Sequence, residues 1–315
     1  MLHGRRTARA PTRERGGPVT LPLRTPDGLP VEVPDYTLLH LSDTHLTSAG
    51  VLYNQRVDAD LALDRAVVEI RRAIGNGHQF DALVVSGDLT DTGDPEAYRR
   101  LAGMLEPLNI PVIWCNGNHD VRTTYHRELL GDEEGSTDSK IQFHWVGADL
   151  GLRVIVLDST VPDAGHGYLD PRLPESFAPI LARPAPGGTI VVLHHSPLPP
   201  PSPLLSYFAL DRRSRQTLFT TIAGADVRLI LSGHHHMAQS GMLGSVPVVV
   251  AGSTAIRTDP FARPGHERTT SSASMNLIRI YPDTYTCSVI PLDGADEVFD
   301  LDEAQCAGII DRHPI

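Results

Sequence analysis

The sequence predicts an α/β fold in which a mixed β-sheet, or two stacked sheets, is flanked by helices. Short apolar runs rich in Val, Ile and Leu recur along the chain and end in Gly, Asp or Pro, as buried strands do. Helical patterns separate the early runs up to about residue 125, which is typical of βαβ units around a central sheet. The length of 315 residues fits one large domain of this class.

Seven apolar runs are interpreted as buried strands, and most of them lead directly into polar residues. In chain order they are YTLLHL (36–41), DALVVS (81–86), IPVIWC (110–115), LRVIVL (152–157), TIVVL (189–193), VRLIL (227–231) and VPVVV (246–250). A later stretch, residues 275–292, is predicted to form a β-hairpin that turns at Pro282 and Asp283, because this pair marks turns. The strands therefore lie closer together in the second half of the chain than in the first.

Two helical patterns between the early strands have recognisable ends. The first begins at Asp58, whose carboxylate suits the N-cap, and stops at Gly75. The second opens with Asp94 and Pro95, since a capping aspartate is often followed by proline at the first helical position. The proline-rich stretch 196–205 is interpreted as an ordered loop that leaves the strand before it.

The composition divides the chain into three parts. Residues 1–34 are rich in Arg, Pro and Gly and are expected to form a flexible basic arm; 35–293 form the domain; and 294–315 form an acidic tail that ends in a helix or a loose segment. Arg5 and Arg6 resemble a twin-arginine start, but no apolar segment follows them. Because no run approaches the 18 apolar residues of a membrane span, we expect a soluble cytoplasmic protein.

The overall charge and the cysteines exclude several classes of function. A formal net charge of −11 argues against general nucleic-acid binding through a basic surface. The three cysteines are scattered and have no CxxC spacing, which argues against a disulfide framework and a zinc–thiolate site. They are Cys115, Cys287 and Cys306.

Residues that can ligate metals follow or end five of the predicted strands. They are Asp43-Thr44-His45, Gly87-Asp88, Asn118-His119-Asp120, His194-His195 and His234-His235-His236. In open α/β sheets, ligands and metals gather beyond the carboxyl ends of the strands. Glycines stand directly before Asp88, Asn118 and His234 and suit turns where the backbone passes close to an ion. The combination predicts a centre of two metal ions.

The spacing within these groups suggests which side chains share a face. In an extended chain, residues two apart point the same way. Asp43 and His45 are therefore expected to reach one metal together. By the same rule, His234 and His236 point together and His235 points away.

The full set of these motifs resembles the calcineurin-like metallophosphoesterases over residues 36–292. The resemblance rests on Asp43-x-His45, Gly87-Asp88, Gly117-Asn118-His119-Asp120, His194 and Gly233-His234-x-His236. It implies a two-sheet mixed β-sandwich flanked by helices. It also implies two metal ions at the separation of two-metal hydrolases, about 3.5 Å.

The resemblance also assigns the metal ligands residue by residue. The first metal is expected on Asp43, His45, Asp88 and His236. The second is expected on Asp88, Asn118, His194 and His234, which makes Asp88 the bridge. Mixed nitrogen and oxygen ligands without a thiolate suit Fe, Mn, Zn or Co, and the sequence does not choose among them.

The remaining histidines receive different expectations. His119 matches the catalytic residue of the family and is expected to contact the phosphoryl group. His195 and His166 are candidate substrate contacts, with His195 placed behind the ligands or on the rim of the pocket. His40 lies inside a strand and is assigned to the core. His235 is assigned to neither metal, although it could alter the edge of the pocket.

Histidine ligands usually hold their second ring nitrogen against a carboxylate or a carbonyl. Asp91, Asp120 and Asp158 are the candidate carboxylates, and each could equally be a turn residue. Loops around 163–168 and 197–213 are expected to form the rim that selects the substrate.

The motif surroundings indicate a branch within the family. The chain reads GDLTDTG and GNHD where serine/threonine protein phosphatases resemble GDxVDRG and GNHE, so that branch is disfavoured. Nucleotidase-type members tend to carry Asn in the first motif, which here reads SDTH. The stretches LLHLSDTHL, WCNGNHD and LSGHHHM are similar to bacterial class III cyclic nucleotide phosphodiesterases, and closest to the actinobacterial form.

The branch implies hydrolysis of 3′,5′-cyclic AMP to 5′-AMP, with a small phosphodiester as substrate and a homodimer as the assembly. Two alternatives stay open. One is a glycerophosphodiester or broad-specificity phosphodiesterase with nearly the same ligands. The other is a non-catalytic protein that uses its metals for binding, with peripheral envelope contact through the termini.

Overall fold

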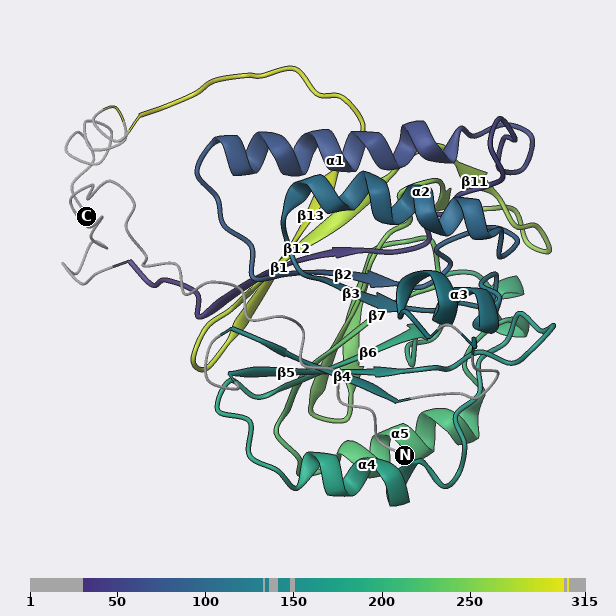
Figure 1. Cartoon of the computed structure of the whole chain (residues 1–315), viewed down its shortest axis with the longest axis vertical. Coiled ribbons are helices and arrows are strands. Elements are labelled where there is room, and N and C mark those ends of the chain that lie inside the picture. The colour runs from purple at the N-terminus through teal and green to yellow at the C-terminus, as the bar shows by residue number, and fades with distance from the viewer. Residues whose placement is uncertain (1–30, 133, 136–140, 148–150, 303–304, 306–315) are drawn as a thin grey trace.

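The strands build two stacked sheets, as the resemblance implied (Figure 1). The structure is a computed structural model, which describes residues 31–132, 134–135, 141–147, 151–302 and 305. The first sheet has five strands in the order β13-β12-β1-β2-β3, and the second has six in the order β4-β5-β6-β7-β9-β8. In the first, β1 (Tyr36–Leu41), β2 (Ala82–Ser86) and β3 (Val112–Cys115) run parallel, and β12 (Ser274–Ile280) and β13 (Tyr285–Pro291) complete the sheet. The two-sheet mixed α/β sandwich is therefore confirmed.

The second sheet is also mixed. Its parallel strands are β5 (Leu152–Leu157), β6 (Thr189–His195), β7 (Val227–Gly233) and β9 (Val246–Val250). Its antiparallel edges are β4 (Gln142–Val146) and β8 (Gln239–Leu243). A separate short ladder joins β10 (Arg257–Thr258) to β11 (Thr269–Thr270).

Helices cover the outer face of each sheet (Figure 1). On the five-stranded sheet lie α1 (Ala59–Gly75) and α2 (Pro95–Leu105), which the short η1 (Glu106–Leu108) follows. On the six-stranded sheet lie α4 (Leu173–Leu181) and α5 (Arg212–Ile222). Helix α3 (Arg122–Leu129) follows the loop after β3, and the short η2 (Leu204–Tyr207) lies in the proline-rich loop. Asp58 and Asp94 accept hydrogen bonds from the first turns of α1 and α2, as predicted.

Alternating side chains of the strands separate the apolar core into layers. On β1, Leu38 packs between the two sheets, whereas Leu39 packs under α1 and α2. On β6, Val192 faces the space between the sheets and Val191 packs under α4 and α5. A strand that is buried on both faces has apolar residues at successive positions, so its sequence is a continuous apolar run. These strands could therefore be recognised in the sequence.

Several elements were not predicted. They are strands β4 and β8, helices α3, α4 and α5 and the β10–β11 ladder. Helix α5 does have an N-cap, Asp211, whose side chain accepts hydrogen bonds from Arg213 and Ser214 of its first turn. The predicted hairpin is confirmed, with β12 and β13 joined across Pro282 and Asp283.

The ends of the chain lie mostly outside the described residues, including nearly all of the expected arm at 1–34 and the last part of the tail. Residues 294–302 are exposed and form no helix or strand. Within the described part of the chain, no helix is both long and apolar enough to cross a membrane.

Candidate metal centre

The site forms where the carboxyl ends of strands from both sheets meet. Asp43 and His45 follow β1, Asp88 follows β2 and Asn118 follows β3, all on the five-stranded sheet. The six-stranded sheet supplies His194 from the end of β6 and the histidines after β7. Parallel pairing of β1 with β2, β2 with β3 and β6 with β7 brings these ends to one edge of the sandwich.

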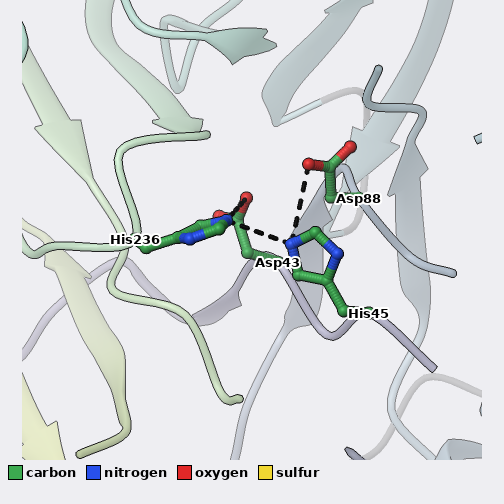
Figure 2. A group of neighbouring side chains, drawn as sticks. All are labelled: Asp43, His45, Asp88 and His236. Carbon is green, nitrogen blue, oxygen red and sulfur yellow. Dashed lines mark hydrogen bonds and ion pairs between the residues drawn. The ribbon is translucent and has the colours of Figure 1, made fainter. Parts of the chain in front are cut away.

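One cluster joins Asp43, His45, Asp88 and His236 (Figure 2). The Nε2 atoms of His45 and His236 lie 3.0 Å apart, and His236 Nε2 lies 3.3 Å from Asp43 Oδ1. His45 Nε2 lies 3.7 Å from Asp88 Oδ2. Asp43, His45 and Asp88 are buried, and the side chain of His236 is 17% exposed. His236 therefore borders solvent in an otherwise buried cluster.

A second cluster joins Asp88, His194 and His234, beside Asn118. His194 Nε2 lies 3.3 Å from Asp88 Oδ2 and 3.2 Å from the side-chain oxygen of Asn118. His234 Nδ1 lies 3.2 Å from the same nitrogen of His194. The oxygen Asp88 Oδ2 thus faces a histidine nitrogen of each cluster.

The spacing of these atoms fits metal ions. A metal with bonds of 2.0–2.2 Å in tetrahedral geometry keeps its ligand atoms about 3.4 Å apart. The separations in both clusters lie between 3.0 and 3.7 Å. Two ring nitrogens that approach each other at 3.0 Å, as in His45 and His236, suit a shared cation better than a direct hydrogen bond inside a carboxylate-rich cluster. The residues present can therefore hold metal.

The other ring nitrogens fix the orientation of the rings. His194 Nδ1 donates to the backbone oxygen of Ser86 (2.8 Å), and His234 Nε2 donates to that of Phe208 (2.8 Å). When each ring is neutral, these bonds leave the other nitrogen unprotonated and turned toward the cluster, as in metal-binding histidines. No sequence pattern indicates which two carbonyls do this, because every residue has a backbone oxygen.

The backbone around the site is left-handed at many of the candidate ligands. Asp43 and His45 have φ of 52° and 45°, Asp88 has 48°, and His234 and His236 have 70° and 49°. The chain at these residues is therefore not extended, and the rule that residues two apart point the same way does not apply to them. His234 and His236 do not share a cluster, because the left-handed turns send them to different ones.

Two glycines allow backbone and ligands to approach closely. A Cβ atom added to Gly117 would lie 2.2 Å from both the backbone nitrogen and Oδ1 of Asp88. One added to Gly233 would lie 1.8 Å from Ser42 Oγ and 2.6 Å from Asp43 Oδ2. These glycines were predicted to let the backbone pass close to an ion; in the structure they make room for the carboxylates of the clusters.

His119 stands at the mouth of the site, with 39% of its side chain exposed. Its Nδ1 lies 2.9 Å from the backbone oxygen and 3.2 Å from Oδ1 of Asp91, and its backbone N–H donates to Asp88 Oδ1 at 2.9 Å. Burial lowers the pKa of His119, but its hydrogen bond with Asp91 and its attraction to Asp88 outweigh burial and raise the pKa to about 10. Asp91 also lies 3.7 Å from His45 Nδ1.

The two other candidate carboxylates hold the loops around the site. Asp120 accepts hydrogen bonds from the backbone nitrogens of Leu89, Thr90 and Gly117 and from the hydroxyl of Tyr98. Asp158 pairs with Arg122 at 2.7 Å. Of the three candidate carboxylates, Asp91 is thus the one that contacts histidines. Asp120 and Asp158 hold loops in place, in line with the alternative expectation that they are turn residues.

Three histidines differ in part from expectation. His195 is fully buried against the rings of His194 and His234, where its Nδ1 contacts Ser159 Oγ (2.9 Å) and its Nε2 contacts Gly165 O (3.2 Å). Of its two expected places, the one behind the ligands is therefore correct, whereas the rim and a direct substrate contact are not. His235 is also fully buried and bonds Gln239, so it does not form the edge of the pocket. His166 is exposed and belongs to neither cluster.

His40 is buried inside β1, as predicted, and its Nε2 contacts Ser86 Oγ at 2.9 Å. A residue that sequence reasoning missed is Ser253, whose hydroxyl donates to the backbone oxygen of Asp43 at 2.7 Å. It holds the left-handed turn at Asp43 from a segment that follows β9.

The charge balance of the second cluster centres on Asp88. Burial would raise the pKa of Asp88, but His194, His45 and His119 hold it well below its usual range. Burial lowers the pKa of His194, but attraction to Asp88 outweighs this and raises it to about 9. Without metal, His194 is therefore protonated at neutral pH.

The chain is similar to known proteins. Residues 36–238 match the family model described as calcineurin-like phosphoesterase. The chain is 39% identical to the cAMP/cGMP dual specificity phosphodiesterase of Mycobacterium tuberculosis, over 84% of this chain and 82% of that protein. It is 39% identical to the probable cyclic nucleotide phosphodiesterase of Rhodococcus erythropolis, over 86% of this chain and 89% of that protein.

Among solved structures, a purple acid phosphatase from yellow lupin seeds matches with a TM-score of 0.55 and 12% identity, over 82% of this chain and 51% of the other. At this identity the match supports the fold alone.

Asn118→Ala is expected to weaken metal binding at the second cluster and to remove most activity, because it deletes the oxygen beside His194 Nε2. His235→Ala is expected to keep both, at a cost of about 2 kcal/mol in stability from the lost hydrogen bond and the cavity. Metal analysis, thermal unfolding and hydrolysis of bis(p-nitrophenyl) phosphate with added manganese measure these effects. An inactive His235→Ala beside an active Asn118→Ala would reverse the assignment.

Gly117→Ala is expected to abolish metal binding at both clusters, because its Cβ would displace Asp88. Gly103→Ala in α2 is the matched control, since nothing lies within 4 Å of its added Cβ. It is expected to keep full activity and to stabilise the helix by about 0.5–1 kcal/mol. Metal content and denaturant unfolding of the two variants provide the measurement, and a metal-replete Gly117→Ala would contradict the assigned role of Asp88.

Metal binding at pH 7 is expected to release at least one proton, because His194 has a pKa of about 9 without metal and must become neutral to bind. The apparent affinity should therefore rise about tenfold per pH unit and level off above pH 9. Calorimetric titration of metal-free protein in buffers of different ionisation enthalpy measures the release. Equal heats in all buffers would show that His194 gives up no proton.

Proposed function

The chain belongs to the calcineurin-like phosphoesterase family, and on this basis we propose that it hydrolyses 3′,5′-cyclic nucleotides, cyclic AMP foremost, to 5′-nucleotides. The observation that carries this proposal is the 39% identity to two proteins named as cyclic nucleotide phosphodiesterases, each over more than four fifths of this chain. The two clusters of metal-binding residues support it independently.

The proposed centre holds two metal ions that share Asp88. Asp43, His45 and His236 complete the first ligand set, and Asn118, His194 and His234 complete the second. Support comes from the separations of 3.0–3.7 Å and from the position of Asp88 Oδ2 beside both sets. The mixture of imidazole, carboxylate and amide suits iron, manganese, zinc or cobalt, and metal analysis of the purified protein distinguishes them.

The bound metals supply an activated water and charge stabilisation at the phosphoryl group. The reaction adds water to phosphorus and breaks the P–O3′ bond, so O3′ must gain a proton. The chain offers His119 for this step. Asp91 holds its Nδ1 and stabilises the imidazolium, which leaves Nε2 as the donor toward the substrate.

The assembly and the location of the protein remain predictions. They are a homodimer, a cytoplasmic location and envelope contact through the termini. Size measurement and fractionation of the full chain and of a chain without residues 1–34 test them together.

His119→Ala is expected to lower kcat on cyclic AMP by about 10²–10⁴-fold with metal content unchanged, because O3′ loses its proton donor. The loss should be smaller on bis(p-nitrophenyl) phosphate, since p-nitrophenolate leaves without a proton. His78→Ala, an exposed histidine after α1, is the control. Equal losses of His119→Ala on both substrates would argue against proton donation.

The substrate is tested by kcat/KM for cyclic AMP, cyclic GMP, 2′,3′-cyclic nucleotides and glycerophosphodiesters on the metal-loaded protein. The proposal expects the 3′,5′-cyclic nucleotides to lead. Fast turnover of glycerophosphodiesters beside slow turnover of cyclic AMP would replace it with the glycerophosphodiesterase alternative. Metal binding without hydrolysis of any of these diesters would favour a binding protein.

A further inference from the structure

A cavity of about 360 Å³ lies between the proline-rich loop after β6 and the loop that joins β10 to β11. We propose that this cavity binds the nucleobase of the substrate, and that Tyr207 and Arg263 are its main contacts. The inference rests on the proposed function, because it assigns the part of a cyclic nucleotide that the metal centre does not hold. The volume falls at the lower end of the range for small-molecule sites, about 300–1,000 Å³.

Residues next to both walls of the cavity hydrogen-bond to histidines of the metal centre. Phe208, next to Tyr207, accepts a hydrogen bond from His234 Nε2 at 2.8 Å. Thr258, two residues before Pro260, donates its backbone N–H to the oxygen of His236 at 3.1 Å. Tyr207 and Pro260 both line the cavity. A substrate with its phosphoryl group at the metals can therefore extend along either wall into it.

The two walls form a built structure. The hydroxyl of Ser202, a buried residue of one wall, donates to Glu267 Oε2 of the other at 2.7 Å. The base of the second loop is closed by the ion pair of Asp259 with Arg268 and by a backbone hydrogen bond of 2.8 Å between the same residues. These bonds keep the two walls at a fixed separation. A cavity with fixed walls suits a rigid, planar group.

The lining has the chemistry that recognises a heterocyclic base. Tyr207 presents an aromatic ring that is 78% exposed, although large apolar side chains are normally buried. Arg263 and His266 add planar groups with hydrogen-bond donors, and prolines complete the apolar surface. Aromatic rings and guanidinium groups stack on bases, and arginine can also donate to N7 or O6 of a purine. A glycerol moiety has no planar ring and could not stack on Tyr207.

The test compares cyclic AMP with methyl riboside 3′,5′-cyclic phosphate, which has the same cyclic diester and no base, on metal-loaded full-length protein. Tyr207→Ala is expected to lower kcat/KM for cyclic AMP about 5- to 150-fold, the range measured for one stacked base. It should leave kcat/KM for the base-free diester unchanged. Arg263→Met should act in the same direction. Phe299→Ala removes an aromatic ring that is 74% exposed and outside the cavity, and is the matched control.

Equal effects of Tyr207→Ala on the two diesters, or no effect on either, would overturn the assignment. A second measurement separates this outcome from failure of the proposed function. If the wild-type protein does not hydrolyse cyclic AMP, the proposed function fails, and the subsite is tested by calorimetric binding of 5′-AMP against ribose 5-phosphate. The subsite requires wild type to prefer 5′-AMP and Tyr207→Ala to lose that preference; equal binding of both by wild type would refute it.

Discussion

The carboxylate of Asp88 carries a buried negative charge between two groups of histidine nitrogens, and the arrangement of the site follows from the need to stabilise it. A buried charge is costly unless it is paired and hydrogen-bonded. Asp88 Oδ2 faces His45 and His194, and Asp88 Oδ1 accepts the backbone N–H of His119. In the absence of metal, protons on His194 and His119 supply the positive charge, so metal ions and protons compete for His194.

This arrangement is stabilised by the rest of the fold. Five candidate ligands adopt the left-handed backbone conformation. For a residue with a side chain, this conformation costs about 1 kcal/mol or more of folding free energy. The sum is comparable with the whole stability of a domain, about 5–15 kcal/mol. Apolar layers on both faces of each sheet and the carboxylate of Asp120 hold the strand ends in place. Bound metal adds stability to the same conformation.

The site opens toward solvent on one side. Asp43, His45, Asp88 and His194 are nearly inaccessible, whereas His119 is 39% exposed. His234 and His236 form hydrogen bonds with Phe208 and Thr258, which lie beside the loops around the cavity. If the proposed base site is correct, the strand ends carry the reaction and the loops around the cavity select the substrate.

The sequence by itself determined the strands that are buried on both faces, the β12–β13 hairpin, the capped helices α1 and α2, and the set of residues that the structure gathers at the site. It could do so because doubly buried strands are continuous apolar runs, and because Asp, Asn and His at five strand ends form a rare pattern. The tertiary structure decided what each side chain contacts. His234 and His235 are neighbours in the sequence, yet one enters the second cluster and the other is buried against Gln239. The reason is physical: left-handed turns break the alternation of an extended chain, and the contacts that hold those turns come from distant segments such as Ser253.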